Sequence, residues 1–103
     1  MTIKQKTENG TQTFTLEGSL NSVTAKDYSN ALSALDKSVK KLVLDFDNLE
    51  YISSAGIRQI LETSRLCGNL GIDFQIINVN NSVMDVFHIT QLDTHLKITL
   101  KNN

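Results

Sequence analysis

Two adjacent serines, Ser53 and Ser54, stand where the sequence could support a chemical role. Ala55 and Gly56 follow them, so four small residues stand in a row before a helical pattern begins. One serine can act as a helix N-cap, because its hydroxyl accepts a hydrogen bond from a free backbone N–H group, and Gly56 can serve close packing. One hydroxyl is enough for capping. The second is left facing solvent at a positively polarised helix end.

A phosphorylation switch at Ser54 is the second interpretation of these residues. The free N–H groups and the helix dipole favour an anion there by about 0.3–2 kcal/mol, so a phosphate should hardly disturb the fold. A partner that docks on this surface would have to accommodate the charge, and a charge left buried and unpaired costs about 3–5 kcal/mol. Each 1.4 kcal/mol is about tenfold in affinity. The residues alone leave both interpretations open.

Other chemically able side chains lack suitable neighbours. His88 and His95 are seven residues apart, without Cys or carboxylate at a zinc-ligand spacing, so we expect no metal and no cofactor. A serine hydrolase would require Gly-x-Ser-x-Gly, and residues 52–56 lack the first glycine. Cys67 ends an apolar helical face and is expected in the core. We therefore expect a protein that is not an enzyme, with a nucleophilic Ser54 as the weakest alternative.

Length and composition predict one domain over residues 1–103. Hydrophobic residues make up 40% and charged residues 20% of the chain, a globular balance. The net charge of −1 argues against a nucleic-acid partner, because phosphates are bound by concentrated positive charge. No apolar run approaches the roughly 20 residues of a membrane-spanning helix, and no signal peptide opens the chain. We expect a cytoplasmic protein with no membrane partner.

The first half of the chain predicts a hairpin, a helix and a buried strand. A hairpin is expected from strands at residues 2–7 and 11–17, which flank an Asn-Gly turn signal. A helical repeat of apolar residues follows from Thr24, a candidate N-cap. Residues 42–46 are almost continuously apolar, which is typical of a strand buried on both faces. We interpret residues 47–52 as the connection to the next helix.

The second half continues the alternation of helices and strands. A helix is expected from the serines to Gly68, then a strand around Phe74, a short helix opened by Asn80, and a last strand at residues 97–100. The order is β-β-α-β-α-β-α-β. It implies a mixed, mostly parallel α/β sheet after the N-terminal hairpin, with helices packed against it. Such sheets place functional groups at the carboxyl ends of strands, where Ser54 lies.

Several stretches resemble STAS domains, and in particular the small anti-sigma factor antagonists of bacteria. They cover nearly the whole chain, in the order residues 16–21, 24–25, 42–46, 49–58 and 86–93. In the family pattern Asp-Ser-Ser/Thr-Gly, the phosphorylated serine follows the Asp. Aligning the glycine with Gly56 implies Ser54 as the acceptor, with Ser53 as a secondary candidate.

The resemblance implies a partner-switching protein. The unphosphorylated form would bind an anti-sigma factor that is also a serine kinase of the GHKL type, and so release a sigma factor. Phosphorylation at Ser54 would break that complex, and a PP2C-type phosphatase would restore it. The implied partner-binding residues are Asn21, Ser22, Ser53, Ser54, Ala55, Gly56, Ile57 and Arg58.

Two positions depart from the family pattern. Ser53 replaces the Asp that precedes the phosphorylated serine, and Asn21 replaces an Asp common before the first helix. Both changes remove negative charge beside the proposed switch. They bear on recognition by the kinase and on any metal or nucleotide contact through those acids. The alternative to the switch is a STAS interaction or scaffolding module that binds constitutively, without phosphorylation.

Overall fold

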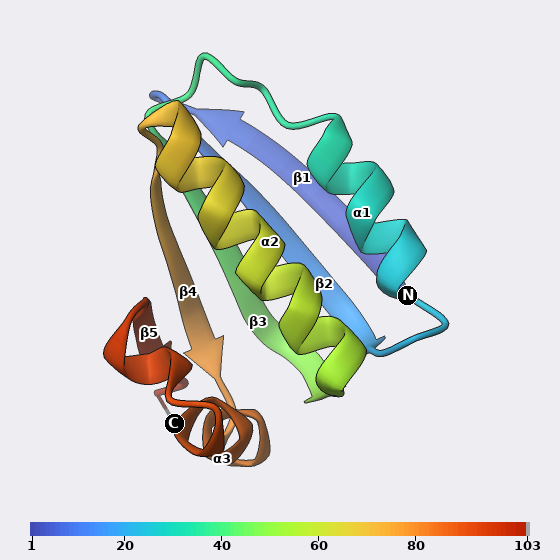
Figure 1. Cartoon of the computed structure of the whole chain (residues 1–103). Coiled ribbons are helices and arrows are strands. Elements are labelled where there is room, and N and C mark those ends of the chain that lie inside the picture. Colours follow the sequence, from blue (N-terminus) through green and yellow to red (C-terminus); the bar gives the residue numbers. More distant parts are fainter. Residues whose placement is uncertain (103) are drawn as a thin grey trace.

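The computed structural model describes residues 1–102 and contains one five-stranded sheet in the order β1-β2-β3-β4-β5 (Figure 1). The strands are β1 (Thr2–Glu8), β2 (Thr11–Leu20), β3 (Lys41–Ile52), β4 (Asp73–Val79) and β5 (Lys97–Leu100). β1 and β2 are antiparallel, and every other neighbouring pair is parallel. The helices are α1 (Ala25–Ser33), α2 (Ser54–Leu70), α3 (Asn81–Ile89) and the 3₁₀ helix η1 (Leu92–Thr94). The predicted α/β order and mixed sheet are confirmed.

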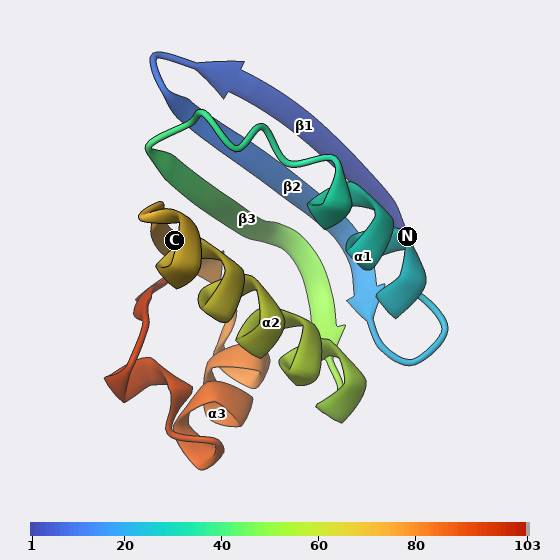
Figure 2. The ribbon, with the colours of Figure 1, turned by 45° about the horizontal axis from the view of Figure 1, so that its top comes forward.

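The three α-helices pack on the same face of the sheet. α1 and α2 lie side by side over the strands (Figures 1 and 2). α3 joins them through Phe87, whose ring stacks on Phe46 of β3 at a centroid distance of 6.3 Å. The strand order explains this arrangement. Each parallel connection moves the chain to the next strand in the same direction, so right-handed crossovers place every helix on one side.

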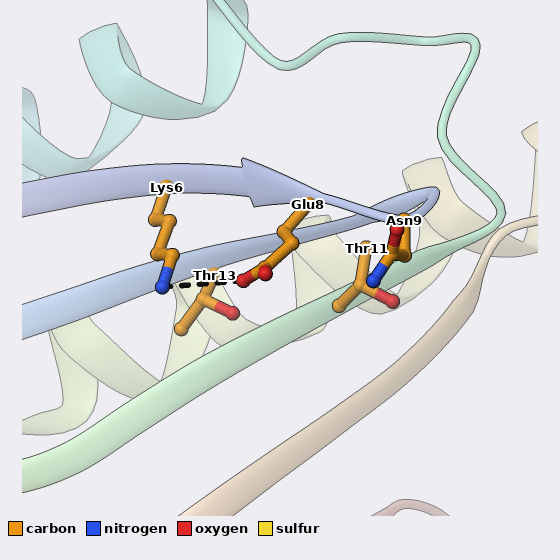
Figure 3. A pocket seen from close by; sticks show the side chains of 5 residues that line it. All are labelled: Lys6, Glu8, Asn9, Thr11 and Thr13. Atoms are coloured by element: carbon orange, nitrogen blue, oxygen red, sulfur yellow. Dashed lines mark ion pairs between the residues drawn. The ribbon is translucent and has the colours of Figure 1, made fainter.

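The opposite face carries polar side chains of the hairpin. A hollow of about 310 Å³ lies on this face. Figure 3 shows the side chains that line it: Lys6, Glu8, Asn9, Thr11 and Thr13. Lys6 already pairs with Glu8 at 3.2 Å. The hollow therefore offers no free charge, and we do not place the functional site there.

β3 is longer than the sequence indicated, because residues 47–52 continue the strand instead of connecting it to α2. Its pairing with β2 slips twice, between Thr15 and Glu17 and again between Gly18 and Ser19. Bulges of this kind break the two-residue alternation of a strand. The buried residues of this part of β3 are therefore three apart: Phe46, Leu49 and Ile52.

α2 also ends later than predicted, at Leu70 instead of near Gly68. Gly71 has a positive φ of 70° and stands just past the end of the helix. The N–H of Ile72 then donates to the carbonyl of Cys67 at 2.9 Å, which closes the helix in the manner of a Schellman motif. Gly68 lies within the last turn, where a glycine is tolerated.

Candidate partner-binding site

Ser53 and Ser54 lie at the junction of β3 and α2, at the carboxyl end of the central strand. Ser53 is the N-cap residue, with an extended backbone (φ −99°, ψ −179°), and Ser54 is the first residue of the helix. The N–H of Ser53 donates to the carbonyl of Leu20 at 2.9 Å. The carbonyl of Ser53 accepts from the N–H of Ile57 at 2.9 Å, closing the first helical turn. The junction is thus held by backbone hydrogen bonds to β2 and within α2.

The two serine side chains have different environments. Ser53 Oγ is buried and has no hydrogen-bond partner among residues 1–102, so this serine does not cap the helix with its side chain. Ser54 is exposed. Of the two residues, Ser54 is therefore the one that another protein can reach without rearrangement of the junction.

Gly56 fixes the height of α2 above the sheet. A Cβ at this position would lie 2.7 Å from the carbonyl oxygen of Leu20 and 2.6 Å from Cγ1 of Ile52. Both distances are shorter than van der Waals contact, so only glycine permits this approach. The first turn of α2 consequently lies directly against Leu20 at the end of β2 and Ile52 at the end of β3.

Asn21 organises the turn that enters α1, on the neighbouring strand end. Its Oδ1 accepts from the N–H groups of Val23 at 2.9 Å and Thr24 at 3.1 Å. Thr24 Oγ1 in turn accepts from the N–H of Asn21 at 2.9 Å and donates to the carbonyl of Ser19 at 2.7 Å. Thr24 holds the N-cap position, as predicted, but its side chain caps no helical N–H. The amide oxygen of Asn21 thus accepts the same backbone hydrogen bonds that the carboxylate of an Asp at this position could accept.

The eight residues predicted to bind a partner differ in accessibility. Ser22, Ser54 and Arg58 are exposed, Asn21, Ser53 and Ala55 are half-buried, and Gly56 and Ile57 are buried. Gly56 and Ile57 can shape the surface but offer little area for contact. Their place in a partner interface stays a prediction.

Two exposed apolar residues near the ends of β2 and β3 were missed in the sequence. Val23 is 84% exposed in the turn after β2, and Tyr51 is 51% exposed near the end of β3. The strand that precedes Val23, β2, is the neighbour of β3, since Ser19 pairs with Tyr51. The sequence offered one local signal. Val23 is an apolar residue inside the turn before α1, where the hydrophobic core does not need an apolar side chain. Exposed apolar and aromatic side chains near these two strand ends are candidates for protein contact.

The described part of the chain, residues 1–102, contains no group of three His, Cys, Asp or Glu residues that could hold a metal ion. The one cysteine, Cys67, is buried, and burial raises its pKa to about 11, which keeps the thiol protonated near neutrality. None of the helices in this part of the chain is long and apolar enough to cross a membrane.

The fold and the site together define a small α/β interaction domain with an accessible serine at the start of its second helix. The chain belongs to the STAS domain family, whose model matches residues 2–103. This confirms the resemblance drawn from the sequence.

Similar proteins are described as anti-sigma factor antagonists. BtrV of Bordetella bronchiseptica, provisionally named as one, is 33% identical over 76 residues, which cover 73% of this chain and 66% of BtrV. An anti-sigma factor antagonist from Mycobacterium paratuberculosis has a TM-score of 0.85 at 22% identity, over 95% of this chain and 84% of the other. The antagonist SpoIIAA in its unphosphorylated form has a TM-score of 0.70 at 15% identity, over 99% and 90%. These two structures show a shared fold.

Proposed function

We propose that this protein is an anti-sigma factor antagonist controlled by phosphorylation of Ser54. In its unphosphorylated form it binds an anti-sigma factor that is a serine kinase of the GHKL type, and thereby releases a sigma factor in the cytoplasm. Phosphorylation of Ser54 by that kinase ends the complex, and a PP2C-type phosphatase restores it. The relationship to BtrV supports the antagonist role.

The observation that carries the proposal is the contrast between the two serines. Ser54 is exposed on the first turn of α2, whereas Ser53 Oγ is enclosed. A kinase must bring the acceptor oxygen to its own active site, so it requires a hydroxyl that the fold leaves accessible. This supports Ser54 over Ser53 as the acceptor.

The local physics supports a switch that acts on the interface and spares the fold. The first N–H groups of α2 and its dipole favour a negative charge at Ser54. Ser54 is exposed, so a partner docked on this surface would lie directly against a phosphate. The partner would have to desolvate the phosphate or bring its own negative groups close to it. The complex is therefore weakened far more than the monomer.

Binding to a purified GHKL-type anti-sigma factor kinase from the same genome tests the proposal. Ser54→Asp should weaken binding at least tenfold, about 1.4 kcal/mol or more. Ser54→Ala should bind as the wild type does and resist release by ATP. Ser38→Asp, which adds the same charge at an exposed loop before β3, is the matched control and should bind normally. Equal affinities of the wild type and Ser54→Asp would contradict the proposal.

Intact-mass analysis after incubation with kinase and ATP separates the remaining alternatives. One added phosphate is expected in the wild type and in Ser53→Ala, and none in Ser54→Ala. A phosphate that persists in Ser54→Ala but not in Ser53→Ala would identify Ser53 as the acceptor. Stable binding with no phosphate in any variant would instead favour the constitutive interaction module.

A further inference from the structure

Arg58 is a free cation one helical turn from Ser54. Residues four apart on a helix are neighbours on its surface, and both Ser54 and Arg58 are exposed. The six ion pairs found within residues 1–102 do not include Arg58. The helix thus presents an unpaired guanidinium beside the hydroxyl that we expect to be phosphorylated.

The nearest acid further along the same helical face is already engaged. Glu62 follows Arg58 by four residues, but its carboxylate binds Arg65 Nη1 at 2.6 Å. Arg58 therefore lacks an intrahelical partner on its C-terminal side. On its N-terminal side the residue at the same spacing is Ser54, which is neutral until it is modified.

Extending the proposed phosphorylation of Ser54, we propose that Arg58 is the intramolecular counter-ion of the Ser54 phosphate. An anion placed four residues before a cation is the favourable orientation on a helix, because it also matches the helix dipole. The planar guanidinium can donate two parallel hydrogen bonds to phosphate oxygens. In the unphosphorylated protein the same guanidinium faces solvent and is available to an acidic group on a partner.

The pairing gives phosphorylation two effects on the docking surface. It adds negative charge at Ser54, and it withdraws the positive charge of Arg58 from any partner. A carboxylate at position 54 is shorter and carries less charge than a phosphate. Ser54→Asp should therefore reproduce only part of the loss of binding caused by phosphoserine.

A phosphoserine installed at position 54 by chemical ligation or codon expansion tests the pairing without any kinase. The second pKa of the phosphate, ordinarily about 6, is followed by ³¹P NMR during a pH titration. A nearby cation favours the dianion and lowers this pKa. Arg58→Gln should raise it by about 0.3 unit or more, and Arg58→Lys, which keeps the charge but loses the planar fork, should raise it less.

Lys40→Gln is the matched control, since it removes one exposed positive charge just before β3, at the end of that strand away from Ser54. It should leave the phosphate pKa unchanged. Equal pKa values in the wild type, Arg58→Gln and Lys40→Gln would overturn the pairing. Because the phosphate is installed chemically, this result is independent of whether a kinase modifies Ser54. A kinase that spares Ser54 would refute the proposed function and leave this measurement standing.

Discussion

Gly56 of α2 lies against the backbone of Leu20, so closely that a Cβ at position 56 would stand 2.7 Å from the Leu20 carbonyl oxygen. That oxygen also accepts the hydrogen bond from the N–H of Ser53. One backbone carbonyl at the end of β2 therefore determines both the approach of α2 and the position of the serine junction.

Substitution of Gly56 by alanine should destabilise the protein. The added methyl group must displace backbone atoms, which costs about 1–3 kcal/mol of the free energy of unfolding and outweighs the better helix propensity of alanine. Gly68→Ala, in the same helix, is the control, because a Cβ there meets nothing within 4 Å. Gly68→Ala should raise the free energy of unfolding by up to about 1 kcal/mol. Urea denaturation that ranks the two variants equally would disprove the close approach.

Ser53→Ala should be nearly neutral, although Ser53 holds an N-cap position. Loss of a working cap costs about 0.5–2 kcal/mol, but Ser53 Oγ makes no hydrogen bond to lose. Asn80→Ala is the comparison at the N-cap of α3. Its Oδ1 accepts from the N–H of Val83 at 2.8 Å, and its Nδ2 donates to the carbonyl of Leu49 at 2.9 Å.

Thermal and urea denaturation should separate these two cap variants. Asn80→Ala should lose about 1–2 kcal/mol, whereas Ser53→Ala should stay within about 0.5 kcal/mol of the wild type. A large loss in Ser53→Ala would mean that its hydroxyl has a partner in solution.

Tyr28 and Thr63 join α1 to α2 through a buried hydrogen bond, with their oxygens 2.7 Å apart. Thr63 Oγ1 also donates to the carbonyl of Gln59 at 2.8 Å, so the tyrosine hydroxyl is the donor of the pair. Thr63→Val should cost about 1–3 kcal/mol, because it leaves the Tyr28 hydroxyl buried and unpaired. Tyr28→Phe should cost less, about 0.5–1.5 kcal/mol, since Thr63 keeps its hydrogen bond to the carbonyl of Gln59. Chemical denaturation giving the reverse order would refute this arrangement.

The stability of the protein should fall in alkaline solution, partly because of Cys67. Burial raises the pKa of this thiol from 9.0 to about 11 in the folded protein. Between these values the unfolded chain loses the thiol proton and the folded chain keeps it, so the free energy of unfolding decreases as pH rises. The contribution is fully present below pH 9. Cys67→Ala should show a shallower decline between pH 9 and 10 in urea denaturation, whatever its stability at pH 7; an unchanged slope would contradict the shift.

The element order could be predicted because its signals are local. The alternation in β2 and the spacing of apolar residues in α2 depend on neighbours within a few residues. Asn80 was expected to open the third helix, and its side chain does cap α3. The final strand at residues 97–100 also lies where it was predicted. Ser54 was likewise expected at the first turn of the second helix, and it is the first residue of α2.

The end of β3 was not predictable in the same way. Its buried residues are three apart, because bulges against β2 change the direction of successive side chains. That spacing matches neither a regular strand nor a regular helix. Only the pairing with a second strand, distant in sequence, makes residues 47–52 a strand.

The sequence by itself therefore determined the kind of protein: an α/β STAS chain with two serines at a helix start. Which serine is accessible was decided by the tertiary structure. Ser53 Oγ is buried at the junction of β3 and α2, whereas Ser54, the next residue, is exposed. The accessibility of a side chain depends on atoms that folding brings together from separate strands, so it could not be deduced from the neighbouring residues in the sequence.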